Sequence, residues 1–493
     1  MSRLTERLKQ WTNKLTIKHY ILICAGLLLL LLNGIAVLTE LPIIPLITAA
    51  VFLVYIVIFR IDVAMYLMAF STPFSIIISH KEIHLGLSLP AEAFMIAISL
   101  MFLFRILYDL RLDKKLLTHP VSIALYVYLL WMLLTCLTSE IPVVSFKFWA
   151  SKLWFTTSCF WMLTVLIKGD HTKAIRFFNC YAAALAIVVL ITTIKHAGSG
   201  FDKHYAHWVM SPFYNDHTAY GAVLAFFLPI TACCFFLPKN NIFHRIFYAS
   251  LTILFALALY LSFSRAAWLS LIIAIGIWIV LKLRIKFSWF VIGTLIVGGV
   301  LYFYADDILY KMSRNSQDSS TSFVEHIKSM SNISTDASNV ERLNRWNSAF
   351  SMIKERPVVG WGPGTYQFEY APYQKSKYKT IISTNFGDGG NAHSEYIGPC
   401  AETGIPGALT VIVMFIIALY TGLKTYNHTE DPYDRLLALM MTLALITYYV
   451  HGSMNNFLDT DKLSLPFWGA FAVIVMTNVR MKSSLKTDSL EKI

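Results

Sequence analysis

Charged residues are scarce in this sequence, and their scarcity excludes an ordinary water-soluble globular protein. Of the 493 residues, 14% are Asp, Glu, Lys or Arg, whereas 56% are hydrophobic. Cysteine is absent from the long polar stretch 306–395, and all seven cysteines fall inside apolar runs. Because disulfide frameworks join cysteines of polar, extracellular segments, no such framework is implied.

The sequence also lacks the signatures of nucleotide and metal enzymes. It has neither a phosphate-binding GxxxxGK[ST] loop nor a dinucleotide-binding glycine fingerprint. His204 and His207 stand three residues apart, but no acid or cysteine accompanies them at ligand spacing. We therefore expect no metal and no cofactor, so the energy of any reaction comes with the substrate or from a gradient.

Apolar runs of membrane-spanning length follow one another from His19 onward. They predict an all-α polytopic membrane protein with about fourteen transmembrane helices. The expected spans are 19–38, 42–59, 62–80, 90–108, 120–138, 147–168, 173–196, 217–237, 243–263, 265–284, 288–305, 396–424, 433–453 and 464–480. Proline interrupts 42–59 and 62–80, and a re-entrant pair there would reduce the count to twelve.

The formal charge is +12, and the distribution of the Lys and Arg residues indicates membrane topology and not nucleic-acid binding. Lys and Arg gather in alternate short loops, such as Arg105–Lys115, Lys168–Arg176 and Lys282–Lys286. By the positive-inside rule, both termini are then cytoplasmic and the long polar segment is outside. The expected organisation is a basic tail (1–18), a membrane domain of about eleven helices (19–305), one large, partly helical periplasmic loop (306–395), about three further helices (396–480) and a tail (481–493).

The outer segment contains one clear helix signal. Ser338 and Glu341 form a capping box, and an apolar stripe at helical spacing follows until Pro357. The glycine-rich run Gly360–Gly364 then predicts a tight turn at the membrane surface.

The stretch from Asn391 to Gly407 combines polar groups with a break in an apolar run. His393, Glu395 and Tyr396 stand at its water edge, and Glu402 precedes Gly404-Ile405-Pro406-Gly407. Charges and irregular backbone at membrane depth usually face a cavity or a protein partner. The run predicts a site at the membrane boundary, with a helix start rich in caps as the alternative.

Three arginines are candidates for binding a phosphate or diphosphate. Arg342 and Arg345 share a helix face, and a guanidinium binds phosphate oxygens in a two-pronged manner. The alternative is a pair of solvated arginines, with Arg345 paired to Glu341. Arg265 lies at an outer hinge between two spans, where it pairs with another group, lines a wet cavity or extends to the lipid headgroups.

A third outer stretch opens the span 217–237. Asp216, His217 and Tyr220 lie within about one helical turn of each other. They indicate either a site or a simple N-terminal cap.

Taken in order, these motifs resemble the bacterial O-antigen ligase and polymerase superfamily. The resemblance rests on Ser-Arg-Ala-Ala at 264–267, Arg-x-x-x-Trp ending in Pro-x-x-Gly-x-Gly between Arg342 and Gly362, and Asn-x-His-Ser-x-Tyr through Glu-x-Gly-Ile-x-Gly between Asn391 and Gly407. It implies a GT-C-like, metal-independent glycosyltransferase of the bacterial inner membrane. Such enzymes move a glycan from undecaprenyl diphosphate to an acceptor on the periplasmic face: lipid A core for ligases, another glycan repeat for polymerases.

The resemblance also implies roles for individual residues. His393 matches the essential loop histidine and would be catalytic, while Arg265, Arg345 and their neighbour Arg342 would bind the diphosphate. The expected supporting residues are Asn391, Glu395, Tyr396, Glu402, His217 and Tyr220. A histidine can take a proton near neutral pH, and arginines keep their charge at any pH. Direct attack by the acceptor would invert the anomeric centre.

Two features depart from the family pattern: fourteen spans are more than usual, and the stretch 365–390 is long and rich in Lys and Tyr. The rival class is a transporter of polysaccharide or small anions, since transporters use broken helices with charged groups at membrane depth. Against a transporter, the charged residues gather at one membrane face beside a folded outer loop.

Overall fold

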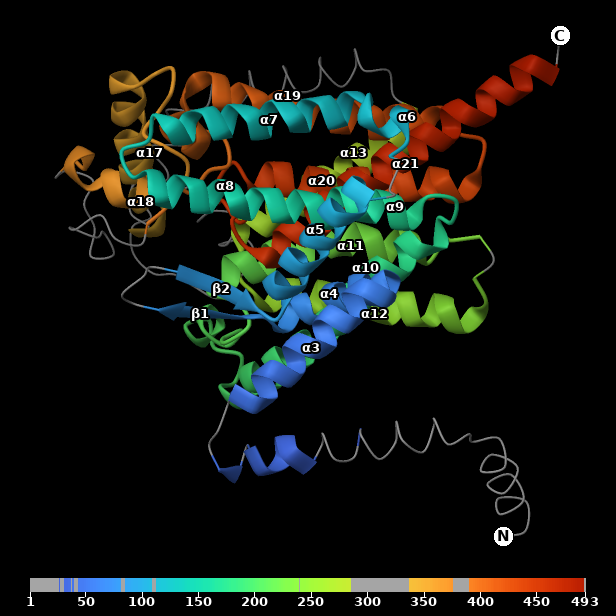
Figure 1. Ribbon diagram of the computed structural model, residues 1–493, viewed down its shortest axis with the longest axis horizontal. Helices are drawn as coiled ribbons and strands as arrows, with labels where there is room; N and C mark the ends of the chain where they lie inside the picture. The colour runs from blue at the N-terminus through green and yellow to red at the C-terminus, as the bar shows by residue number, and fades with distance from the viewer. Residues whose placement is uncertain are drawn as a thin grey trace. The chain divides into compact units, whose positions relative to one another are not determined.

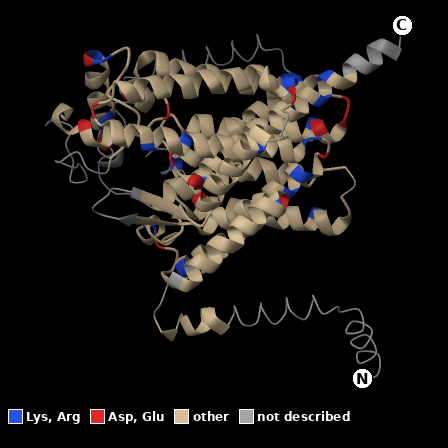
Figure 2. Ribbon diagram, viewed as in Figure 1, with Lys and Arg blue, Asp and Glu red and all other residues tan. Residues whose placement is uncertain are grey.

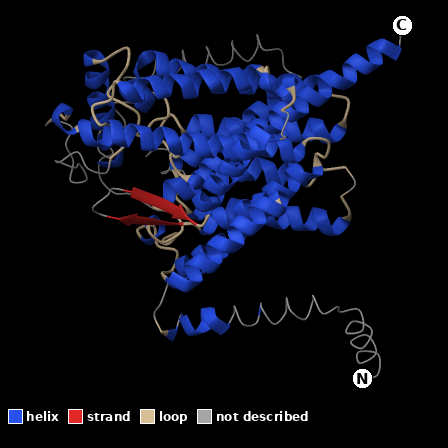
Figure 3. Cartoon of the chain, viewed as in Figure 1, coloured by secondary structure: helices blue, strands red, loops and turns tan. Residues whose placement is uncertain are grey.

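The structure is a computed structural model that describes residues 26, 31–36, 38–39, 43–80, 85–108, 112–238, 240–284, 337–375 and 390–491. The chain divides into two compact units, Met1–Ala64 and Met65–Ile493. Most of the described chain is helical, with a single hairpin of two strands in these residues (Figure 3). The expectation of an all-α polytopic membrane protein is therefore confirmed at the level of fold class.

Ten helices in the described residues are long and apolar enough to cross a membrane. They are α5 (Ala91–Tyr108), α7 (Pro120–Leu137), the run Pro142–Ile167 formed by α8 (Pro142–Thr156), the π-helical η2 (Thr157–Met162) and α9 (Leu163–Ile167), α10 (Thr172–Gly198), α11 (His217–Cys234), α12 (Ile242–Leu261), α13 (Arg265–Lys282), α19 (Ile397–His428), α20 (Pro432–His451) and the first part of α21 (Asp461–Glu491). Each lies at an expected span, and α21 continues beyond the expected end at Arg480.

The remaining expected spans have different outcomes. The runs 19–38 and 288–305 lie largely or wholly outside the described residues. The run 42–59 is a shorter apolar helix, α3 (Ile43–Phe59). The expectation for 62–80 is wrong, because α4 (Ile61–Ser71) ends early and η1 (Thr72–Phe74) follows.

A β-hairpin occupies the second part of that wrongly predicted span. Strand β1 (Ile76–His80) pairs antiparallel with β2 (Leu85–Leu89), and Ile76 lies opposite Leu89. Pro73 lies in the 3₁₀ turn, and three consecutive isoleucines follow at 76–78. Proline cannot supply the N–H that would continue a helix, and β-branched residues favour strands, so apolar composition alone misled the prediction.

The basic loops meet at one end of the unit Met65–Ile493. Lys168 lies 3.4 Å from Asp113, and Lys115 donates to Ser483 at 3.1 Å. Arg480 donates to both oxygens of Asp434, at 2.7 and 2.9 Å. Charged residues gather toward the helix ends and leave the middle of most helices apolar (Figure 2). This grouping is the one that the alternating charge pattern predicts.

Helix α20 lies at the centre of the packing and contacts α11, α13, α19 and α21, while α19 runs along α7 (Figure 1). The starts of α11, α13 and α19 and the end of α20 lie at the end opposite the basic loops. The amphipathic helix α17 (Ala337–Glu355) packs against α19 at that end, followed by α18 (Tyr366–Glu369) and η4 (Ala371–Tyr373). The short helices α6 (Lys114–Leu117) and η3 (Tyr205–His207) complete the described elements.

Helix α19 is broken at Gly404, whose φ is +73°. The loop after α17 supplies the hydrogen bonds that the break would otherwise leave unmade. The amides of Trp361 and Gly362 donate to the carbonyls of Ala401 and Glu402, at 3.1 and 2.8 Å. The amide of Ile405 donates to the carbonyl of Pro357 at 2.8 Å. Irregular backbone at membrane depth is thus satisfied by protein, as the low-polarity environment requires.

This close approach explains the glycines on both sides. A Cβ on Gly404 would overlap the carbonyl of Val358, and a Cβ on Gly360 would overlap the backbone of Glu402. Both glycines also have positive φ, which side chains disfavour. The Gly360–Gly364 turn and the α19 break are therefore one unit.

We expect Gly404→Ala to destabilise the protein by more than about 3 kcal/mol, because backbone strain and overlap add. Gly398→Ala is the matched control on the same helix, since a Cβ there meets only the Ala392 Cβ at 3.6 Å. Thermal unfolding of both purified variants measures the difference. Equal melting temperatures would show that the break does not depend on Gly404.

Candidate functional site

Positively charged and imidazole side chains converge where α17 meets the starts of α11, α13 and α19 and the end of α20. The charge of Arg342 acts on three histidines from three different segments, His217, His393 and His451. Arg345 acts on His393, and Arg265 acts on His217. We call Arg265, Arg342, Arg345, His217, His393 and His451 the cationic cluster. The structure thus brings together residues that are up to 234 positions apart in the sequence, from His217 to His451.

His393 lies on a sharply turned segment just before α19. Its φ is +48°, a left-handed conformation uncommon for a residue with a side chain. The backbone amide donates to Asn391 Oδ1 at 3.1 Å, and Ser394 Oγ then accepts the amides of Tyr396 and Ile397, both at 3.2 Å. Asn391 and Ser394 therefore shape the turn and begin the helix, leaving the half-buried imidazole of His393 free of these bonds.

Arg345 holds this turn from α17. Its Nη1 donates to the carbonyl of Asn391 at 3.0 Å, and its Nε donates to Glu341 at 2.7 Å. The guanidinium also lies 5.2 Å from the centre of the Tyr370 ring. The pairing with Glu341 that the sequence offered as an alternative is present, but the pair is buried and not solvated. Arg345 therefore has a structural role, beside any role toward a substrate.

The surroundings change the acid–base behaviour of His393. Burial, followed by the charges of Arg345 and Arg342, lowers its pKa from 6.5 to about 3, and Asp216 opposes the shift. The imidazole is consequently neutral at neutral pH and able to accept a proton. The sequence predicts that His393 takes a proton near neutral pH, but in the free protein its pKa is much lower.

Arg265 is the first residue of α13 and follows Ser264 at the hinge after α12. The hinge is tightly packed, since a Cβ on Gly221 of α11 would lie 2.7 Å from the Ser264 Cβ and 3.3 Å from the Ala267 Cβ. Arg265 is half-buried at this position, and its charge reaches His217. The close fit of α11 on the hinge fixes where that charge lies.

Asp216, His217 and Tyr220 have three different roles in the structure. Asp216 is the N-terminal cap of α11, because its Oδ1 accepts the amides of Thr218 and Ala219 at 2.7 and 2.8 Å. His217 belongs to the cationic cluster, and its ring lies 4.0 Å from the ring of His207.

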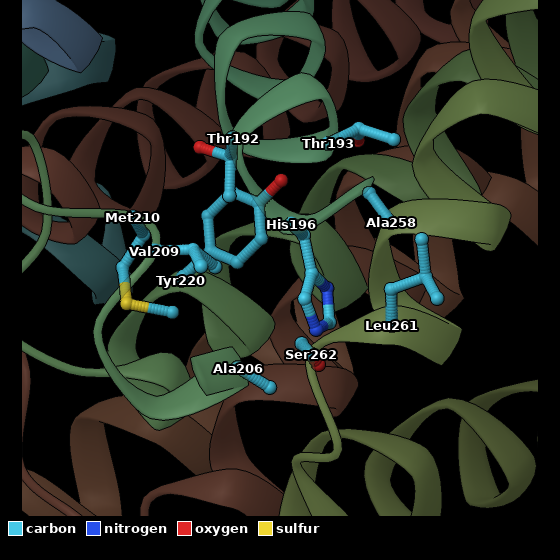
Figure 4. Close-up of a pocket in the computed structure, with 10 residues that line it drawn as sticks. All are labelled: Thr192, Thr193, His196, Ala206, Val209, Met210, Tyr220, Ala258, Leu261 and Ser262. Atoms are coloured by element: carbon cyan, nitrogen blue, oxygen red, sulfur yellow. The ribbon is translucent and has the colours of Figure 1, made fainter. Parts of the chain in front are cut away.

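Tyr220 points elsewhere, into a separate cavity beside Thr192 and Met210 (Figure 4). That cavity holds about 10 Å³, room for about one water molecule, so it is too small for a substrate. The structure therefore does not bring Tyr220 to His393.

Three other expected residues connect the His393 segment to the rest of the fold. Glu395 accepts hydrogen bonds from the Tyr448 hydroxyl and, at 3.0 Å, from the amide of Leu458. The hydroxyl of Tyr396 donates to the carbonyl of Tyr449 at 2.7 Å. These bonds fix the segment against α20 and the loop that follows it.

Glu402 acts on the other side of α19. Its Oε1 accepts the amide of Tyr366 at 3.2 Å, while its carbonyl accepts Gly362 across the break. The indole of Trp131 in α7 donates to the neighbouring Thr403 carbonyl at 2.8 Å. Glu402 therefore stabilises the broken helix and the glycine-rich turn together.

Sequence reasoning missed His451 and did not assign His207 to a site. His451 ends α20, and its Nε2 lies 3.2 Å from Asn455 Nδ2. The sequence does contain a signal for His451: a histidine at the outer end of an apolar span, four residues before Asn455. Its proximity to Arg342, however, depends on tertiary packing alone.

One possible metal-ligand group occurs in the described residues, at the basic end of the molecule. Ligand atoms of His171, Asp431 and Asp434 lie within 4.8 Å of one another. Asp434 is already paired with Arg480, and Asp431 caps α20 by accepting the amide of Tyr433 at 2.8 Å. Both carboxylates thus have structural roles, and the group lies at the end opposite His393.

Comparison with known proteins gives two findings. An uncharacterized protein of Haemophilus influenzae is 21% identical over 135 residues, which are 27% of this chain and 33% of that protein. The aligned part thus spans about a third of the relative's length. Residues 250–412 match a family model described as O-antigen ligase. The matched range contains Arg265, Arg342, Arg345 and His393, so this part of the chain is similar to the O-antigen ligase family.

Proposed function

We propose that this protein transfers a glycan from undecaprenyl diphosphate to lipid A core oligosaccharide on the periplasmic face of the bacterial inner membrane. The observation that carries the proposal is a neutral histidine on a fixed turn beside arginines, at the ends of membrane-spanning helices. The match of residues 250–412 to the O-antigen ligase family supports a ligase-like or polymerase-like membrane glycosyltransferase.

The chemistry needs a base for the acceptor and positive charge for the leaving group. In our proposal His393 takes the proton of the acceptor hydroxyl while that oxygen attacks the anomeric carbon of the donor sugar. The bond from this carbon to the diphosphate oxygen breaks, and the electron pair leaves with the diphosphate. Arg265, Arg342 and Arg345 stabilise the negative charge of the leaving group without a metal. A single displacement inverts the anomeric centre.

Donor binding would also activate the base. The pKa of free His393 is about 3, partly because Arg345 and Arg342 disfavour its protonation. A diphosphate beside these arginines would offset their charge and raise the pKa of His393. A general base is most effective when its pKa is near the working pH, so the donor would convert a weak base into a useful one.

A polymerase is the nearest alternative, because only the acceptor differs. A transporter has one observation in its favour, the break of α19 at Gly404. The backbone groups at this break, however, are bonded to the loop of Pro357, Trp361 and Gly362. This bonding supports a fixed enzyme scaffold over an ion or solute site at the break.

The test is glycan transfer by purified protein in detergent, with lipid-linked donor, lipid A core acceptor and a chelator. No gradient exists in detergent, so an enzyme works and a transporter does not. We expect conversion of lipid A core to a glycan conjugate. Longer lipid-linked glycan without this conjugate would identify a polymerase, and no product with either acceptor would contradict the proposal.

A further inference from the structure

The α10–α11 loop, residues 199–216, connects two membrane-spanning helices at the end opposite the basic loops. Three of its aromatic side chains are exposed: Phe201 by 45%, Tyr205 by 60% and Trp208 by 72%. Tyr205 and Trp208 are three residues apart on the 3₁₀ turn η3, so they lie on the same side of it. Large exposed apolar groups that lie together mark an interaction surface.

The other side of the loop is fixed to the protein. Ala206 and Met210 are each 1% exposed and line the small cavity beside α11 (Figure 4). The buried His196 of α10 donates from Nε2 to the carbonyl of Asp202 at 2.9 Å. These contacts hold the loop in one conformation, with its aromatic side chains on the outside.

The length of α10 places the loop at the level of the lipid headgroups. The basic residues Lys168–Arg176 mark the opposite membrane surface, and α10 extends from there to Gly198. About twenty helical residues, at about 1.5 Å each, cross the roughly 30 Å of hydrocarbon. The helix therefore reaches the far boundary near His196, and the loop begins three residues later.

The lipid-facing side of α10 leads directly to the loop. Ile187, Leu190 and Ile194 are all exposed and lie at helical spacing on one side of α10. Such an exposed apolar stripe on a membrane-spanning helix faces hydrocarbon. Lys195 and Lys203 are exposed where the stripe ends, and ammonium groups bind phosphate oxygens. Phospholipid headgroups thus match both the aromatic and the charged groups, since Trp and Tyr are enriched at this level.

We propose that the α10–α11 loop inserts Phe201, Tyr205 and Trp208 into the phospholipid headgroup layer and thereby fixes the depth of the cationic cluster. The connection is His207, whose ring lies 4.0 Å from the ring of His217. The role of this depth rests on the proposed glycosyl transfer. A lipid-linked donor carries its diphosphate at the headgroup level, so a cluster held at that level can bind it.

Fluorescence quenching in bilayer nanodiscs tests the membrane contact. The full-length protein is placed in phosphatidylcholine whose acyl chains carry bromine either near the glycerol or near the terminal methyl group. The chain has 12 tryptophans, so the emission of Trp208 is the difference between the wild type and Trp208→Phe. Trp468→Phe is the matched control, because Trp468 is 1% exposed inside the fold.

We expect bromine near the glycerol to remove at least about half of the Trp208 emission, more than bromine near the methyl group or iodide in water removes. The Trp468 emission should change little with any of the three quenchers. Quenching of Trp208 by iodide alone would place the loop in water. Quenching by none of them would show that protein covers the loop, and either result would overturn the proposal.

The effect on the cationic cluster is tested with Tyr205→Ser combined with Trp208→Ser. Both side chains are exposed, so the melting temperature in detergent should stay the same. In nanodiscs we expect the KM for the lipid-linked donor to rise at least about threefold, and Trp208→Phe, which keeps an aromatic ring, to stay near the wild type. An unchanged KM in the double variant would overturn the link between the loop and the cluster. No transfer by the wild type would instead contradict the proposed function, while the quenching result would still stand.

Discussion

Replacing His393 with alanine is expected to lower glycan transfer by at least about 10²-fold, the effect of losing a general base. Lipid-linked donor should still bind, because the arginines are unchanged. Stability should change little, since the imidazole makes no hydrogen bond among the described residues and is only half-buried. Transfer rate, donor affinity and melting temperature of the purified variant measure these three expectations.

The control is His428→Ala, at the opposite end of α19. His428 is exposed, and its Nδ1 bonds only to the carbonyl of Lys424, at 2.9 Å. This variant should transfer glycan at the wild-type rate. Normal transfer by His393→Ala would remove the histidine from the reaction, whatever its position.

Arg345→Ala should impair both the fold of the outer segment and catalysis. Removing the guanidinium leaves Glu341 buried beside an empty space and releases the Asn391 carbonyl. Loss of one partner of a buried ion pair costs about 3–5 kcal/mol. Because Asn391 also bonds the amide of His393, the turn should loosen and transfer should fall with stability.

Arg345→Lys separates these effects. A lysine retains the charge but cannot make both bonds with one fixed fork, so partial recovery of stability and transfer is expected. Arg342→Ala provides a comparison, since it removes another positive charge that acts on His393. Arg345→Ala with unchanged melting temperature and transfer would show that the turn does not depend on this residue.

The sequence contained most of the membrane architecture because that information is local. Each of the ten long helices follows from an apolar run of membrane-spanning length, and the α19 break follows from Gly404 and Pro406. The hairpin at Ile76–Leu89 could not be separated from a span, since isoleucines satisfy either structure until the strand pairing is known.

The residues of the candidate site could be predicted from the sequence, but the partners that each of them contacts could not. The sequence indicated His393 and Arg345, yet the bond between Arg345 and Asn391 joins positions 46 residues apart. The low pKa of His393 depends on burial and on Arg342, which only the folded chain supplies. His451 was missed for the same reason, because Arg342, whose charge acts on it, comes from a distant element.

The pH dependence of transfer by the wild type and His393→Gln tests the central claim most directly. A base must be unprotonated, so the rate falls as the pH drops below its pKa. With the pKa of free His393 at about 3, the acid limb of kcat/KM should lie well below pH 6.5. The limb of kcat, which reports the donor-bound protein, should lie at higher pH because the diphosphate offsets Arg342 and Arg345. His393→Gln retains a hydrogen-bonding group but accepts no proton, so it should be nearly inactive and lack this limb. A Gln variant with a near-normal rate and the wild-type pH profile would contradict proton transfer to His393.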